Sequence, residues 1–244
     1  MAELLFYQKI AALNTNIHKK LRFKPVEDYS FSGNIHSVVI VGGEFIECCK
    51  EYPIVFVRST EKKIVPVALL GIKQNENLFV DANGNWQAKY VPAYVRRYPF
   101  VMADDGAGKL TVCIDSAYPG FSDEEGELCF NEQDEPNPWL KGIVDFMQQY
   151  QLDFFRTESF VANLEKLGLL KDMTAKIEIK GGGEYIMNGL LVVDEEKLRE
   201  LDGEKVLSLF KSGELGLIYA HLISMPNLNR LIDLMAKKQP VTLQ

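Results

Sequence analysis

The residues best suited to bind a ligand lie between positions 81 and 98. This stretch combines aromatic rings with two adjacent guanidinium groups and a carboxylate, at Asp81, Trp86, Tyr90, Tyr94, Arg96, Arg97 and Tyr98. An arginine can hold a carboxylate or a phosphate through two parallel hydrogen bonds, and aromatic rings line many ligand pockets. The stretch therefore predicts a groove for a ligand or partner, anchored by Arg97. The competing interpretation is that the rings fill the core and the arginines form surface ion pairs.

An enzyme whose site assembles only in the folded chain is the second hypothesis. The chain has three histidines, at His18, His36 and His221. None is followed two residues later by a carboxylate, as in the HxD pattern of many non-haem iron sites, and no GxSxG sequence occurs. The remaining arrangement places His18 or His221 with the acids Asp81 and Glu44 in acid–base roles. We expect neither a metal site nor a cofactor.

Three glycine-containing stretches resemble ion-binding loops only in part. In residues 104–109 the lysine is followed by Leu110, where a phosphate-binding loop needs Ser or Thr. Residues 181–183 lack the GxGxxG spacing and open no predicted helix. The stretch that starts at Asp81 has Pro92 at position twelve, where a calcium loop needs an acid. All three are predicted to be turns.

Composition and charge exclude several classes of protein. The 244 residues have a hydrophobic share of 47% and a charged share of 25%, which are ordinary values for a globular protein. The net charge of −7 disfavours nucleic-acid binding. The apolar stretches are too short to span a membrane, and the first residues lack the basic and apolar regions of a secretion signal. The four cysteines form no CxxC pair. We therefore expect a cytoplasmic protein with reduced thiols.

The first half of the chain is predicted to be rich in strands. Residues 4–21 have a rough helical spacing and predict a short helix followed by an arm. Runs of β-branched residues predict strands over 36–41, 53–58, 64–72, 77–86, 100–103 and 110–115. Asn83 and Gly84 predict a tight turn. Residues 90–98 predict one amphipathic helix that ends before Pro99 and places Tyr90 and Tyr94 on one face.

The second half is predicted to be rich in helices. Residues 139–170 predict two helices, the second capped by Thr157, and residues 175–194 predict strands. Helices are expected over 195–201, 205–211 and 227–238, whereas the apolar run 216–224 predicts a buried strand. The fold class is therefore α+β, a mixed or antiparallel sheet with helices packed on it. The acidic stretch 118–138 suggests a division into 1–135 and 136–244, and a single domain over 1–244 is the alternative.

Several sequence blocks resemble one bacterial family. They are YQK at 7–9, EYPIVF at 51–56, LFVD at 78–81, GLLVVDEEKL at 189–198 and, above all, YVPAYVRRYPF at 90–100. These blocks are similar to the SapC family along nearly the whole chain. The resemblance implies an association with surface-layer genes and brings no catalytic residues with it. A peptide-transport permease shares the family's name, but it is a membrane protein, and this chain has no predicted span.

The leading hypothesis is a non-enzymatic, cytoplasmic accessory protein that binds a small molecule or a protein partner. It would use the predicted groove and act in the handling of surface-layer or imported molecules. The alternatives are the assembled enzyme described above and a structural protein of the surface layer. Self-association into a homo-oligomer is compatible with each.

Overall fold

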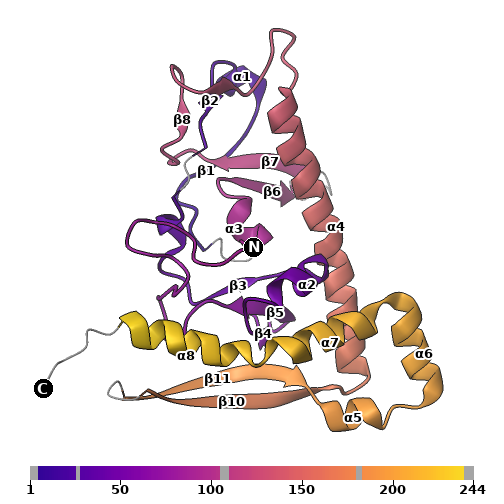
Figure 1. The fold of residues 1–244 in the computed structure, drawn as a ribbon. Coiled ribbons are helices and arrows are strands. Elements are labelled where there is room, and N and C mark those ends of the chain that lie inside the picture. The colour runs from indigo at the N-terminus through magenta and orange to yellow at the C-terminus, as the bar shows by residue number, and fades with distance from the viewer. Residues whose placement is uncertain (1–4, 26–27, 105–109, 180–182, 239–244) are drawn as a thin grey trace, which may run out of the picture. The chain divides into compact units, whose positions relative to one another are not determined.

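The computed structural model describes residues 5–25, 28–104, 110–179 and 183–238 (Figure 1). The predicted turns at 104–109 and 181–183 therefore lie, apart from Asp104 and Gly183, outside the described residues. Contacts divide the chain into two compact units. Unit 1 consists of Met1–Asp28 and Ala93–Leu152, and unit 2 of Tyr29–Pro92 and Asp153–Gln244. Each unit draws on both predicted parts of the chain, and the division at residue 135 stays a prediction.

Unit 1 is built from short antiparallel strands. In one sheet β1 (Ile10–Ala12) pairs with β7 (Leu110–Asp115), which pairs with β6 (Phe100–Asp104). In another, β2 (Arg22–Phe23) lies between β8 (Phe121–Ser122) and β9 (Glu127–Leu128). The helix expected over residues 4–21 is wrong, because among the described residues 5–21 only α1 (Thr15–His18) is helical. Its N-cap Asn14 accepts a hydrogen bond from the backbone N–H of Ile17.

The core of unit 1 is aromatic. Its buried cluster consists of Phe100, Ile114, Cys129, Phe130, Leu140 and Met147. The ring of Phe23 stacks on Trp139 at a centroid distance of 5.0 Å, and it meets Phe100 edge-on. Such ring pairs stabilise beyond the area that they bury, so the two-residue strand β2 is held mainly by its side chains.

Unit 2 contains an antiparallel sheet with the strand order β10-β11-β4-β5-β3. The strands are β10 (Leu170–Ile179), β11 (Gly183–Val193), β4 (Ile54–Arg58), β5 (Ile64–Leu69) and β3 (Ser37–Val39). This arrangement, together with the helices of the second half, confirms the predicted α+β class. The strand expected over 77–86 is wrong, because that stretch forms a turn closed by a single bridge between Val80 and Trp86.

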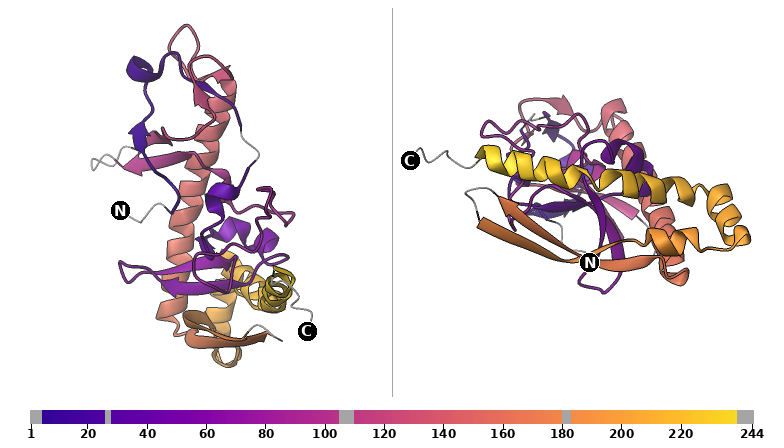
Figure 2. Two further views of the ribbon diagram at one scale, coloured as in Figure 1. Left: turned by 90° about the vertical axis from the view of Figure 1, so that its left-hand side faces the viewer. Right: turned by 60° about the horizontal axis from the view of Figure 1, so that its bottom comes forward.

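Unit 2 also contains several short helices. They are α2 (Phe45–Cys48), α5 (Glu195–Arg199), α6 (Gly203–Ser212), α7 (Glu214–Ser224) and α8 (Asn227–Lys238), with 3₁₀ turns η1 (Ser30–Ser32) and η2 (Gly42–Glu44). Helices α7 and α8 run alongside the β10–β11 hairpin in both Figure 1 and Figure 2. The strand predicted over 216–224 is therefore wrong, because this segment is helix α7.

None of the described helices is by itself long and apolar enough to cross a membrane. The pair made of α6 and the segment 214–238 meets the length and composition criteria, but it is bent by 88°.

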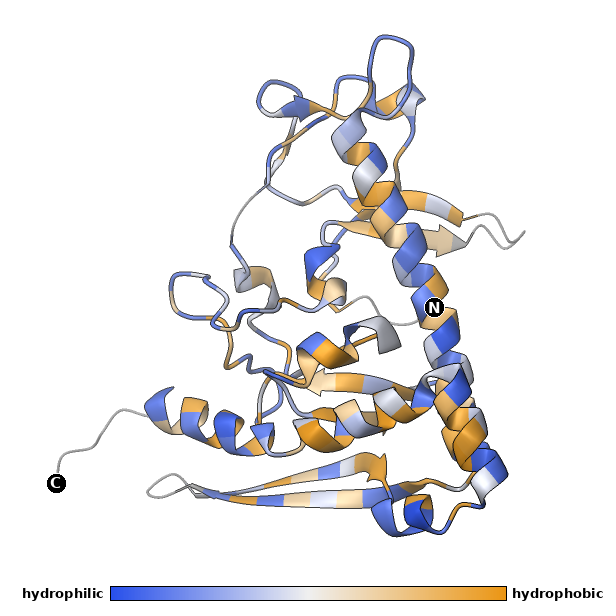
Figure 3. Cartoon of the chain, turned by 45° about the vertical axis from the view of Figure 1, so that its right-hand side comes forward, coloured by the Kyte–Doolittle hydropathy of each residue, from blue (hydrophilic) through white to orange (hydrophobic). Residues whose placement is uncertain are grey.

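One long helix, α4 (Pro138–Lys166), replaces the two helices predicted over 139–170. Hydrophilic and hydrophobic residues alternate along it in Figure 3, as expected of an amphipathic helix. The prediction of Thr157 as an N-cap is wrong, because Thr157 lies inside the helix. Its hydroxyl donates to the Asp153 carbonyl at 2.6 Å and accepts the N–H of Gly42 at 2.8 Å.

Candidate functional site

The predicted site residues are divided between the two units. Asp81, Trp86 and Tyr90 belong to unit 2, and Tyr94, Arg96, Arg97 and Tyr98 belong to unit 1. The helix expected over 90–98 is also shorter than predicted, because α3 spans only Ala93–Arg96, between Pro92 and Pro99. Tyr90 lies before this helix, so the prediction that it shares a helical face with Tyr94 is wrong.

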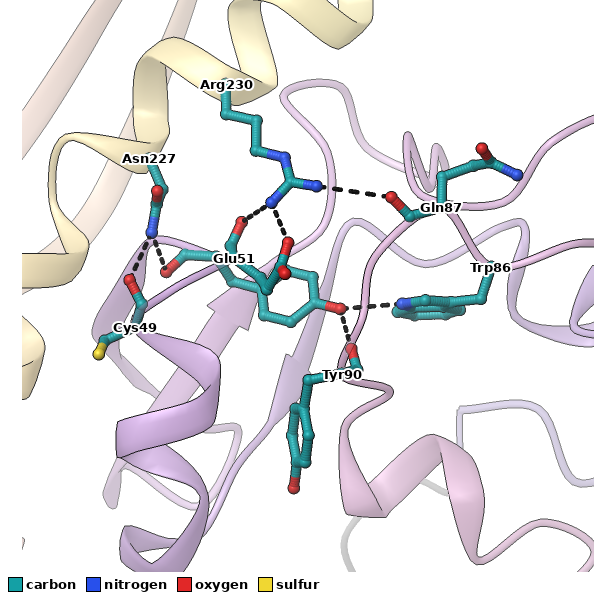
Figure 4. A network of polar contacts seen from close by, with 8 residues as sticks. Cys49, Glu51, Trp86, Gln87, Tyr90, Asn227 and Arg230 are labelled. Atoms are coloured by element: carbon teal, nitrogen blue, oxygen red, sulfur yellow. Dashed lines mark hydrogen bonds and ion pairs between the residues drawn. The ribbon is translucent and has the colours of Figure 1, made fainter.

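Trp86 is tied to the interior of unit 2 by its indole nitrogen. The Nε1–H of Trp86 donates to the hydroxyl of Tyr52 at 2.8 Å, and this hydroxyl in turn donates to the carbonyl of Tyr90 (Figure 4). Tyr52 is fully buried, and burial raises the pKa of its phenol far above the ordinary value. The hydroxyl therefore stays protonated and links Trp86 to Tyr90, at the two ends of the segment 86–90, which we call the Trp86 loop.

A second set of contacts ties the same loop to helix α8. Arg230 binds the carboxylate of Glu51 and also reaches the Glu51 carbonyl at 3.3 Å and the Gln87 carbonyl at 3.5 Å (Figure 4). Its guanidinium lies 5.3 Å from the ring centroid of Phe79. Sequence reasoning missed Glu51 and Arg230 as partners, because 179 positions separate them and no local pattern links them.

Asp81 and Tyr90 also have structural partners. The Oδ1 atom of Asp81 accepts the backbone N–H groups of Asn83 and Asn85 at 2.8 and 2.9 Å, which closes the predicted turn. These hydrogen bonds, led by those from Asn85, lower the pKa of Asp81. The hydroxyl of Tyr90 donates to Glu44 at 2.8 Å. In unit 2, therefore, the polar groups of the candidate residues serve mainly to hold loops.

Arg97 has a different environment in unit 1. Its guanidinium carbon lies 4.0 Å from the ring centroid of Tyr94 and 5.3 Å from that of Tyr150. Both distances fall within the range of cation–π attraction. The guanidinium also donates a hydrogen bond to the hydroxyl of Tyr7. Its Nε atom is buried and has no hydrogen-bond partner among the described residues. A buried donor without a partner is uncommon and calls for an explanation.

Arg96 and Tyr98, the neighbours of Arg97 in sequence, make different contacts from those of Arg97. Arg96 is exposed, and its guanidinium carbon lies 5.2 Å from the ring centroid of Phe146. The hydroxyl of Tyr98 donates to Asp115 at 3.3 Å. Burial, and then the negative charge of Asp115, raise the pKa of Tyr98 to about 12. Tyr94 thus contacts Arg97, whereas Tyr98 contacts Asp115 in the same unit.

Among the residues proposed for acid–base roles in an enzyme, His221, Glu44 and His18 each bond to different groups. His221 is fully buried and bonds to the backbone at Ile54 and Val193. Burial lowers its pKa to about 4, so its ring is neutral at pH 7. Glu44 accepts the N–H of Val41 at 3.0 Å and the hydroxyl of Tyr90. His18, in unit 1, accepts the N–H of Asn14 at 3.3 Å. These contacts all stabilise backbone or loops.

A metal-binding group or a surface hollow could serve as a second candidate site in the part of the chain that the structure describes. No group of three or more His, Cys, Asp or Glu side chains is placed there to hold a metal ion. Two open hollows are lined by residues around Asp202, the N-cap of α6, and around Trp139 in α4, and the lining of a third, small hollow includes Phe154. The predicted site residues do not line these three hollows.

Comparison with known proteins identifies a family. A family model described as SapC matches residues 13–231, which is most of the chain. No curated protein and no solved structure matches it.

Proposed function

We propose that this chain, which belongs to the SapC family, is a non-enzymatic binding protein that captures an anionic group at Arg97. The anionic group would be a carboxylate or phosphate of a small molecule or of a protein partner. The observation that carries this proposal is the buried Nε–H of Arg97, which lacks a hydrogen-bond partner among the described residues. A guanidinium presents five donors in a plane, and a carboxylate or phosphate can take two of them at once.

The surroundings of Arg97 favour recognition of an anion at the edge of the guanidinium. The rings of Tyr94 and Tyr150 lie against it and limit the directions from which a ligand can approach. Tyr7 accepts one N–H, and an anion would satisfy others. Aromatic contacts also restrict the motion of the long side chain, which reduces the entropy lost on binding. Arg96 and Tyr98 flank this point and would contribute to the same surface.

The non-enzymatic form of the proposal rests on His221 and Glu44. Both are engaged by backbone and loop groups, and this supports structural roles rather than proton transfer to a substrate. We further propose that the protein acts in the cytoplasm and handles surface-layer or imported molecules, and the resemblance to a family associated with surface-layer genes supports the second part of this proposal. A structural role in the surface layer is the alternative, and ordered self-assembly of the purified chain would favour it.

Thermal shift measurements with inorganic phosphate and with citrate test the proposal. We expect the anions to raise the melting temperature of the native chain and to have no such effect on Arg97→Gln. Arg199→Gln is the matched control, because it removes the same charge from an exposed side chain that pairs only with Glu195 at 3.1 Å among the described residues. Equal shifts in all three proteins would contradict the proposal, since the anions would then act without Arg97.

A further inference from the structure

The segment Leu5–Ala12, which we call the strap, begins with a turn at Leu5 and Phe6 and ends in strand β1 (Ile10–Ala12). Its last residues form β1 and pair with β7 in antiparallel register, Ile10 opposite Asp115 and Ala12 opposite Cys113. The backbone carbonyl of Lys9 accepts the N–H of Ser116 at 2.8 Å. The last three residues of the strap therefore form an edge strand beside β7 in the sheet β1-β7-β6.

A buried carboxylate holds the strap by its backbone. Asp115 is fully buried, and it accepts the N–H groups of Gln8 at 2.8 Å and Lys9 at 2.9 Å. The same carboxylate accepts the N–H of Ala117 at 3.1 Å and the hydroxyl of Tyr98. These last two contacts come from outside the strap, so they fix the orientation of the carboxylate whether or not the strap is bound.

Two adjacent rings of the strap pack against a set of aromatic residues, which we call the slot. Phe6 meets the rings of Tyr94 and Tyr98 edge-on at 5.6 and 5.4 Å. Tyr7 meets Tyr98 at 5.2 Å, and its hydroxyl donates to the carbonyl of Phe100 at 2.7 Å. We call this slot, together with Asp115 and the paired edge of β7, the strap seat.

The strap itself is only partly buried. Leu5 and Ile10 are each 47% exposed, and Phe6 and Tyr7 are half-buried. Segments with few buried apolar contacts open locally at a small fraction of the global unfolding free energy. By contrast, Asp115, Phe100 and Tyr94 of the strap seat are buried when the strap is in place, and Phe100 and Ile114 of β6 and β7 also belong to the core cluster of unit 1. The strap seat is therefore expected to be more stable than the segment that occupies it.

We propose that the strap seat is an interaction surface that accepts, in exchange for the strap, an extended segment of a partner protein. The segment would carry two adjacent aromatic residues followed by a short β-forming stretch, which is the chemistry of the strap. It would add to β7 as a strand, with main-chain hydrogen bonds supplying affinity and the aromatic slot supplying specificity. This surface uses Asp115 and the ring slot, so it goes beyond the proposed capture of an anion by Arg97.

Binding of a labelled peptide with the sequence of residues 5–12 tests this inference in the full chain. Fluorescence anisotropy would compare the native chain with a Phe6→Ala, Tyr7→Ala variant, whose strap lacks both rings. We expect the peptide to bind the variant at least about tenfold more tightly, because the competing occupant is weakened. Adding Asp115→Asn to the variant should abolish this gain. The matched control is Asp81→Asn, which alters a carboxylate that also accepts backbone N–H groups and should preserve the gain.

Hydrogen exchange of the native chain gives a second measurement that does not depend on variants. We expect the strap amides to exchange faster than the β7 amides that bond to β6. Equal, slow exchange in both would overturn the inference, as would equal peptide affinity for the native chain and the folded strap variant. A concentration-dependent dimer in sedimentation would instead assign the strap seat to a second copy of this chain. None of these results depends on phosphate binding at Arg97, so the two proposals fail separately.

Discussion

The imidazole of His221 accepts a hydrogen bond at 3.0 Å from the backbone N–H of Val193. Its other nitrogen, Nδ1, lies 2.8 Å from the carbonyl of Ile54 and therefore carries the proton. One buried side chain thus joins helix α7 to strands β11 and β4. Desolvation, the larger effect, lowers the pKa of His221 to about 4, although the hydrogen bond to Ile54 opposes it.

The first prediction concerns the pH dependence of stability. The unfolded chain protonates His221 near its ordinary pKa of 6.5, whereas the folded chain does so only near 4. Between these values the unfolded state binds more protons, so the free energy of unfolding must decrease as the pH falls from 6.5 to 4. The contribution of this residue is about 3 kcal/mol. Urea unfolding at a series of pH values measures it.

The control for this prediction is His221→Gln, which keeps a donor and an acceptor but does not titrate. At each pH, the difference in the free energy of unfolding between the native chain and the variant separates the effect of the histidine from that of acidic residues that titrate in the same range. We expect the pH dependence of the variant to be shallower. Parallel curves for the two proteins would mean that His221 does not stay neutral in the folded state.

The second prediction concerns Thr157. Thr157→Val keeps the shape of the side chain and removes the acceptor for the N–H of Gly42, at a site where Thr157 is 4% exposed. A buried N–H without a partner costs about 1–3 kcal/mol, so we expect a decrease of this size in the free energy of unfolding. Ser159→Ala is the control, because the exposed Ser159 hydroxyl bonds only to the carbonyl of Phe155 among the described residues. It should change stability by less than about 0.5 kcal/mol.

The third prediction compares two glycines near the start of α7. Gly213 has φ +81, in the left-handed region, and it ends α6. Gly213→Ala should destabilise by about 1 kcal/mol, because a Cβ is strained in this conformation. Gly216 lies inside α7, and a Cβ there would meet nothing within 4 Å. Gly216→Ala should stabilise by up to about 1 kcal/mol through helix propensity. Thermal denaturation should give a higher melting temperature than that of the native chain for Gly216→Ala and a lower one for Gly213→Ala.

The elements that the sequence predicts correctly are those with a strong local signal. The β-branched runs that form β4 and β5 are examples. The helices expected over 195–201 and 205–211 are also found, the first capped by Asp194, which accepts the N–H of Glu196, and the second ended by Gly213. In each case neighbouring residues alone determine the conformation, and tertiary contacts agree with that preference.

The errors arise where tertiary contacts decide the structure. Helix α7 buries Ile218, Ala220, His221 and Ser224, and its mostly apolar sequence shows little helical periodicity. It also begins directly after Gly213, without a Ser, Thr or Asp cap to announce it. The division of the candidate site between two units could not be predicted either. The chain passes from unit 2 to unit 1 between Pro92 and Ala93, within the predicted site, and no local pattern marks this change. The contact between Arg97 and Tyr150 is likewise not local.

The last prediction concerns the network around Trp86. Tyr52→Phe removes the hydroxyl that accepts from Trp86 and donates to the carbonyl of Tyr90. Each group left unpaired in the interior costs about 1–3 kcal/mol, so urea unfolding should show a clear loss of stability and the fluorescence of Trp86 should change. Tyr219→Phe, at a tyrosine that is 51% exposed, is the control and should leave stability nearly unchanged. If Tyr52→Phe were equally stable, the network would not hold this loop in place, and the half-buried face of Trp86 would again become a candidate for ligand binding.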